Sequence, residues 1–167
     1  MRFEKIFFIF AILICAFEIA RLWGIAPAQM AAHFNAQGSP DRFAPKLQFF
    51  WAQIQTFLAV TGASVVLQVL TLLMPAEWIN IPNRDYWLAP ERRAETKDRI
   101  GSFGPLLFGI VLLAIQAGFE LSVYASLSTP ILFNAPLMIF IMIVTFVGIG
   151  LLLVRLALSF RIPPSVG

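Results

Sequence analysis

Ionisable residues inside apolar segments are the first candidates for chemistry in this chain. Glu18 and Arg21 are three residues apart, so they share one face of a helix and can form an ion pair. Glu120 stands in a different apolar segment, with Gln116 one helical turn before it. Because ionisable groups at membrane depth are costly and usually face the protein interior or water, we expect Glu18 and Glu120 to border one cavity.

Residues 24–46 form the most patterned polar segment, and we expect them to make an ordered, compact loop. Gly38-Ser39-Pro40-Asp41 is typical of a tight turn, because glycine tolerates a positive φ, proline fixes its own φ and aspartate can accept hydrogen bonds from nearby backbone amides. We predict that this loop and the charged residues beside it bind a ligand or organise the loop. The candidate residues are His33, Asn35, Gly38, Pro40, Asp41, Arg42, Lys46, Glu18, Arg21 and Glu120.

One interpretation of these residues is structural. The Glu18–Arg21 ion pair is then internal, and Glu120 accepts hydrogen bonds that hold the loop on the helices, since polar groups in membranes usually have partners. The candidate donors to Glu120 are the loop amides, Gln53, Gln55 and Lys46.

A second interpretation makes the loop a binding site for an external peptide or small ligand, because it offers polar and aromatic side chains together. A third places a metal ion on His33 with Asp41, Glu18 or Glu120, but one histidine without a ligand-spacing motif supports this weakly. We predict no metal and no cofactor.

Motifs for catalysis are missing from the sequence. It has no nucleophile elbow, no His-Glu-x-x-His, no phosphate loop and no nucleotide fingerprint. A general acid–base pair of His33 with Glu18 or Glu120 is the weaker alternative. We predict that the chain is not an enzyme.

The composition decides which elements must position these residues. Of 167 residues, 59% are hydrophobic and 13% are charged, and the mean hydropathy is +0.83. Soluble domains carry about 25% charged residues, so we expect a membrane protein. Apolar blocks at 6–22, 47–74, 103–127 and 136–160 are near or above the ~20 residues that span a bilayer as a helix. We predict an all-α, polytopic protein with four transmembrane helices in a single membrane domain, 1–167.

The basic residues predict the orientation. With the N-terminus in the cytoplasm, nine of twelve Lys and Arg fall inside, so we expect both termini to be cytoplasmic, with an outer loop at 24–46 and an inner loop at 75–101. A cleaved signal peptide is a weaker interpretation of the first block. The scattered basic residues argue against nucleic-acid binding. The nine are Arg2, Lys5, Arg84, Arg92, Arg93, Lys97, Arg99, Arg155 and Arg161.

The inner loop has five acidic and five basic residues, so it is not a polybasic lipid-binding segment. Pro90 and the Glu95–Arg99 spacing predict a short interfacial helix, with Pro90 in its first turn, that runs into the third span. Trp78, Tyr86 and Trp87 are expected to anchor it at headgroup level, with partner docking as the alternative.

The outer loop resembles bacterial membrane proteins grouped as domain of unknown function 1648. The resemblance rests on Pro27, then His33-Phe34-Asn35, Gly38-x-Pro40-Asp41, Phe43 and Lys46, in that order and spacing. It also implies a distant likeness to the immunity proteins that protect cells from a sporulation-delaying peptide toxin.

Together these features predict a non-enzymatic protein of the bacterial inner membrane that binds an envelope ligand or peptide, or acts in immunity or signalling, through the outer loop. The alternative is a structural accessory subunit of a larger membrane complex, and a small membrane enzyme or transporter comes third. The expected partners are the lipid bilayer and a peptide toxin, small ligand or other membrane protein, with no nucleic acid.

Overall fold

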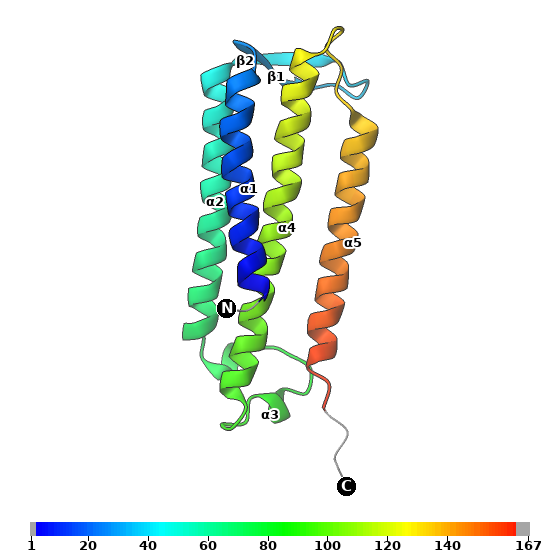
Figure 1. Cartoon of the computed structure of the whole chain (residues 1–167). Helices are drawn as coiled ribbons and strands as arrows, with labels where there is room; N and C mark the ends of the chain where they lie inside the picture. Colours follow the sequence, from blue (N-terminus) through cyan, green and yellow to red (C-terminus); the bar gives the residue numbers. More distant parts are fainter. Residues whose placement is uncertain (1–2, 163–167) are drawn as a thin grey trace.

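The computed structural model describes residues 3–162, which form four long helices standing side by side. A strand pair lies across one end of the helices, and short helical turns close the other end (Figure 1). The long helices are α1 (Phe3–Ile25), α2 (Lys46–Leu73), α4 (Arg93–Leu127) and α5 (Ala135–Ser159). Each is long and apolar enough to cross a membrane. The chain is therefore a mostly helical, multi-pass membrane protein, as predicted, while Arg2 lies outside the described residues.

Helix α4 organises the bundle, since it packs against α1, α2 and α5. The contact with α1 is close at Gly109, where an added Cβ would come 2.6 Å from the ring of Phe7. The absence of a Cβ lets the Phe7 ring lie directly on α4, and a larger residue would require the ring or the helix to shift. Helix α5, in contrast, has no buried residue, so most of its surface faces away from the other helices.

Two apolar clusters hold the bundle together. One, at the end that carries the strands, joins α1, β1, α2 and α4, and the other lies deeper, between α1 and α4. Both clusters include fully buried side chains. Where the protein is in contact with water, burial of apolar side chains is the main favourable contribution to the free energy of folding. The first cluster contains Leu22, Ala26, Met30, Phe49, Phe50 and Val123, and the second Phe8, Cys15 and Leu112.

The expected outer loop is a β-hairpin, which the all-α prediction did not include. Strands β1 (Gln29–Phe34) and β2 (Pro40–Pro45) pair antiparallel, from Gln29 opposite Pro45 to Phe34 opposite Pro40. Register shifts flank His33, which is paired with Arg42. Six-residue strands rich in alanine and proline have weak β-propensity, so tertiary contacts with the helices decide this structure.

The inner loop contains a 3-10 turn, η1 (Ala76–Trp78), and one short helix, α3 (Arg84–Trp87). The predicted short helix around Glu95–Arg99 is the start of α4, which begins at Arg93 and continues through the buried Pro105. Pro90 lies in a turn before this helix and not in its first turn, so that part of the prediction is wrong.

Candidate functional site

Arg21 is the centre of a charged cluster beneath the hairpin. Its Nε donates to Glu18 Oε2 at 2.7 Å, its Nη2 to Glu120 Oε1 at 2.7 Å and its Nη1 to the hydroxyl of Tyr124 at 3.0 Å. The side chains of Arg21 and Glu120 are each 33% exposed. The predicted Glu18–Arg21 pair is confirmed, and the second carboxylate converges on the same guanidinium, which joins α1 to α4.

Two of the donors expected for Glu120, Lys46 and Gln53, have other partners. Lys46 Nζ donates to the carbonyl of Ala26 at 3.0 Å and lies 4.7 Å from the ring centroid of Trp23. Gln53 pairs with Gln116. The prediction for Lys46 and Gln53 is wrong, because it rested on depth along the helices, whereas the rotation of each helix selects the contact and brings Arg21 to Glu120.

Gln53 and Gln116 form a buried amide pair between α2 and α4. Gln53 Nε2 donates to Gln116 Oε1 at 2.9 Å, while Gln53 Oε1 and Gln116 Nε2 have no partner among the described residues. A cavity of about 10 Å³ adjoins them, with Cys15 and Leu112 also in its wall. That is about the space of one water molecule, which could satisfy both free amide atoms.

The hairpin turn is organised by Asn35 and Gly38. The Oδ1 of Asn35 accepts hydrogen bonds from the backbone amides of Gln37 and Ser39, each at 3.0 Å. Gly38 has a φ of 80°, which favours glycine, and its carbonyl accepts a hydrogen bond from the amide of Phe133 at 2.8 Å. A tight turn therefore exists, but it runs from Asn35 to Gly38 and not over the predicted Gly38-Ser39-Pro40-Asp41, because Pro40 already begins β2. The turn is also fastened to the segment between α4 and α5.

The first strand is fastened at two further points, one on α4 and one on the segment between α4 and α5. The amide of Ala31 donates to Ser126 Oγ of α4 at 2.9 Å. The rings of Phe34 and Phe133 lie 4.8 Å apart. With Lys46 on the carbonyl of Ala26, the hairpin is held at its base, along β1 and at its tip.

The remaining candidates are mostly exposed side chains of the two strands. His33 Nδ1 lies 2.6 Å from Asp41 Oδ1, and the two side chains are 59% and 45% exposed. Arg42 is exposed beside them, and Phe43 is 51% exposed, while Pro40 begins β2. Within residues 3–162, no group of three or more His, Cys, Asp or Glu side chains is placed to hold a metal ion.

The three aromatic residues of the inner loop differ from one another. Trp78 is 76% exposed, whereas Trp87 is 2% exposed and donates from its Nε1 to the carbonyl of Phe160 at 2.8 Å. Tyr86 is half-buried, with the guanidinium carbon of Arg92 3.9 Å from its ring centroid. The expected headgroup position fits the exposure of Trp78 but not the burial of Trp87, whose ring and N–H have partners inside the protein.

Residues 9–54 match a protein-family model described as "Domain of unknown function (DUF1648)". The resemblance to domain of unknown function 1648 is confirmed for these residues. This DUF1648 region covers most of α1, the whole hairpin and the first turns of α2. It thus includes Glu18, Arg21 and every candidate residue of the loop, but not Glu120. No curated protein and no solved structure matches the chain.

Several residues of the site lie outside the DUF1648 region and were not predicted. Tyr124 follows Glu120 by one helical turn, so its spacing could have indicated that it shares the same helix face. Ser126 and Phe133 carry no such signal, because their partners in the hairpin are about a hundred residues away in the chain.

Proposed function

We propose that this protein is a non-enzymatic membrane receptor of the binding or immunity type, whose hairpin engages a peptide or protein on the outer side of a bacterial inner membrane. The observation that carries the proposal is the contrast within the hairpin. Its base and β1 are fastened to the helical bundle and its tip to the segment between α4 and α5, whereas His33, Asp41, Arg42 and Phe43 remain exposed.

A fastened hairpin favours binding because little conformational entropy is lost when a partner docks. The exposed side chains of β2 include an aromatic ring, Phe43, and a guanidinium, Arg42, and these two side-chain types are enriched at binding hot spots. Both strands of a two-stranded sheet are edge strands, so an extended peptide can also add to the backbone of β2. These features suit a peptide or protein better than a small molecule, which needs an enclosing pocket.

The orientation belongs to the same proposal. The end opposite the hairpin carries Arg84, Arg92, Arg93, Lys97 and Arg99 in or beside the inner loop. An excess of Lys and Arg favours the cytoplasmic side, so this end is cytoplasmic and the hairpin lies outside.

The experiment uses the bacterium that encodes this protein, with the chromosomal gene deleted. These cells then express either the wild-type chain or a variant from a plasmid. The cells are exposed to concentrated culture supernatant of the parent strain, which contains its secreted peptides. Wild-type protein should restore growth, and Arg42→Ala and Phe43→Ala should each fail to restore it at equal protein levels. Glu91→Ala, an exposed change at the other end, is the matched control and should protect fully.

Equal protection by all variants would refute a binding role for the hairpin. Equal growth with and without the protein would refute the immunity form of the proposal.

A structural accessory subunit is the second candidate, and α5 favours it. Large apolar side chains are exposed along this helix, and none of its residues is buried. Purification in mild detergent distinguishes the two roles: recovery at fixed stoichiometry within a larger complex supports the accessory role, and recovery alone supports the receptor.

A further inference from the structure

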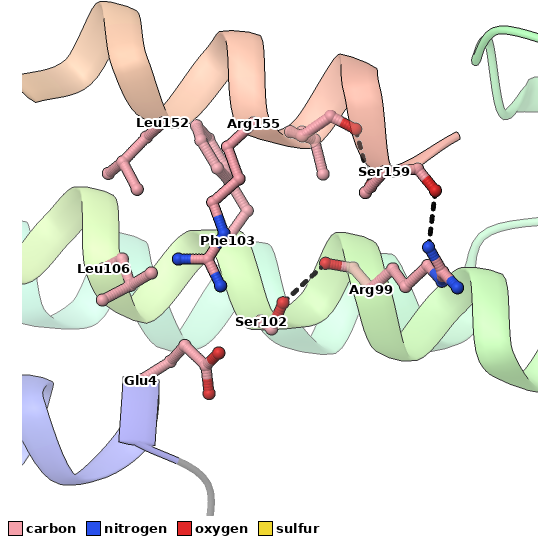
Figure 2. Close-up of a pocket in the computed structure, with 9 residues that line it drawn as sticks. Glu4, Arg99, Ser102, Phe103, Leu106, Leu152, Arg155 and Ser159 are labelled. Atoms are coloured by element: carbon pink, nitrogen blue, oxygen red, sulfur yellow. Dashed lines mark hydrogen bonds between the residues drawn. The ribbon is translucent and has the colours of Figure 1, made fainter. Parts of the chain in front are cut away.

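A cleft lies between α1, α4 and α5 at the end opposite the hairpin, outside the site described above. Figure 2 shows it lined by charged side chains on three sides and apolar side chains between them. Its volume is about 180 Å³. The lining residues are Glu4, Arg99, Ser102, Phe103, Leu106, Leu152, Arg155, Leu156 and Ser159.

Arg155 is the unusual member of the cleft. It stands one helical turn before the end of the apolar helix α5, and within residues 3–162 its guanidinium has no hydrogen-bond acceptor and no ion pair. Arg99 differs, since it bonds to Glu95 and to the carbonyl of Ser159. A guanidinium offers five donors in a planar arrangement that suits phosphate oxygens.

Glu4 supplies the opposite charge. Figure 2 shows its carboxylate on the far wall of the cleft from the guanidinium of Arg155. The two groups do not form an ion pair with each other, so a space separates them. A ligand with a phosphate and a primary ammonium would complement both walls, because the phosphate pairs with Arg155 and the ammonium with Glu4.

An apolar groove adjoins the cleft, one turn further along α4 and α5. Its volume is about 350 Å³, and Ile110, Phe140 and Gly148 are among its lining residues. A Cβ at Gly148 would meet no atom within 4 Å, so the groove is open there. From Arg155 to Ile141, α5 rises about 21 Å, at about 1.5 Å per residue. A lipid acyl chain fills one leaflet, which is half of the ~30 Å hydrocarbon core, or about 15 Å. The groove is therefore long enough to hold one acyl chain.

We propose that this cleft and groove bind one phospholipid with an amine headgroup, of the phosphatidylethanolamine type. The phosphate lies on Arg155, the ammonium faces Glu4 and an acyl chain follows the groove past Gly148. The inner loop is not polybasic, so the site selects a lipid by pairing two charges and not by general attraction to an anionic surface.

The test measures lipid binding to the purified full chain in detergent by native mass spectrometry. Phosphatidylethanolamine, phosphatidylglycerol and phosphatidylcholine with identical acyl chains are added in turn. We expect phosphatidylethanolamine to bind most tightly. Arg155→Gln should weaken its binding about tenfold, since a charge-assisted contact is lost. Arg161→Gln, an exposed change near the same helix end, is the control and should have no effect.

Two further variants separate the headgroup from the chain. Glu4→Gln should remove the preference for phosphatidylethanolamine over phosphatidylglycerol. Gly148→Leu should weaken all three lipids alike, whereas Gly150→Leu, which does not line the groove, should not. Helix content by circular dichroism checks that each variant is folded.

Unchanged affinity in Arg155→Gln, or equal binding of all three lipids by the wild type, would overturn the proposal. Displacement of the bound lipid by millimolar inorganic phosphate would instead show a simple anion site. A dimer that Gly148→Leu dissociates would show that a second copy fills the groove.

Discussion

The backbone of Gly38 lies directly against the backbone of Phe133. The carbonyl of Gly38 accepts the amide hydrogen of Phe133 at 2.8 Å, and a Cβ at Gly38 would lie 2.9 Å from the carbonyl oxygen of Phe133. This contact joins the tip of the hairpin to the segment that leads into α5. Since α5 otherwise packs mainly on α4, the hairpin helps to fix the end of the bundle.

Gly38→Ala should destabilise the protein by about 1–3 kcal/mol, because the new Cβ meets backbone and the φ of 80° disfavours alanine. The free energy of unfolding, measured by titration with sodium dodecyl sulfate in mixed micelles, checks this prediction. Gly24→Ala is the control, since a Cβ there meets no atom within 4 Å, and it should change stability little. Equal stability of the two variants would contradict the close contact.

Arg21 balances two carboxylates, so its loss should cost more than the loss of either partner. Arg21→Met leaves Glu18 and Glu120 close together without a cation, and we expect a lower free energy of unfolding because the two carboxylates then repel each other. Glu120→Gln keeps the Glu18–Arg21 pair and should cost less. The exposed Arg42→Met controls for the loss of a positive charge. If Glu120→Gln costs as much as Arg21→Met in the same titration, the guanidinium does not hold both carboxylates.

The buried pair of Gln53 and Gln116 predicts a non-additive double mutant. Gln53→Leu alone should destabilise by about 1–3 kcal/mol, because it leaves the amide of Gln116 buried without a partner. Adding Gln116→Leu should recover most of this loss, since both polar groups are then removed. Gln55→Leu, an exposed position two residues further along α2 and therefore on another face of the helix, should be close to neutral. Additive losses in the double mutant would show that the two amides do not interact.

The helices could be predicted from the sequence because burial in a membrane requires long apolar runs. Helix α2 was expected at 47–74 and spans Lys46–Leu73. The third apolar block was expected to begin at 103, whereas α4 begins at Arg93. The difference arises because the first turns of α4 are polar and precede the apolar block. The hairpin could not be predicted, because its strands show no clear alternation and depend on contacts such as Gly38 with Phe133.

The candidate site was predictable only where local spacing determines the contact. Glu18 and Arg21 pair because they are three residues apart on one helix. The contact between Arg21 and Glu120 joins residues 99 apart in the chain and depends on how α1 and α4 are rotated. Residue type and depth suggested that Glu120 has a polar partner but could not select it.

Trp87 and Asn83 both hold the carbonyl of Phe160, the residue that caps the C-terminal end of α5. Trp87 Nε1 and Asn83 Nδ2 each donate to the carbonyl of Phe160 at 2.8 Å. Trp87→Phe should therefore cost about 0.5–1.5 kcal/mol, the value of one hydrogen bond, because Asn83 still satisfies this carbonyl. It should also speed hydrogen exchange of backbone amides at the end of α5. Trp78→Phe, at a 76% exposed position, should change neither quantity, and an equal effect of both variants would contradict the role of the Trp87 N–H.

The orientation can be tested with single cysteines at the two ends of the bundle. Ala36 is exposed in the hairpin turn and Glu91 is exposed before α4, while the native Cys15 is buried and is removed by Cys15→Ala. A membrane-impermeant maleimide added to intact spheroplasts should label Ala36→Cys at once, and Glu91→Cys only after lysis, because the basic end of the bundle is expected in the cytoplasm. Labelling of Glu91→Cys alone before lysis would show the reverse orientation, with the hairpin inside the cell. Labelling of both would show that the two ends of the bundle lie on one side of the membrane.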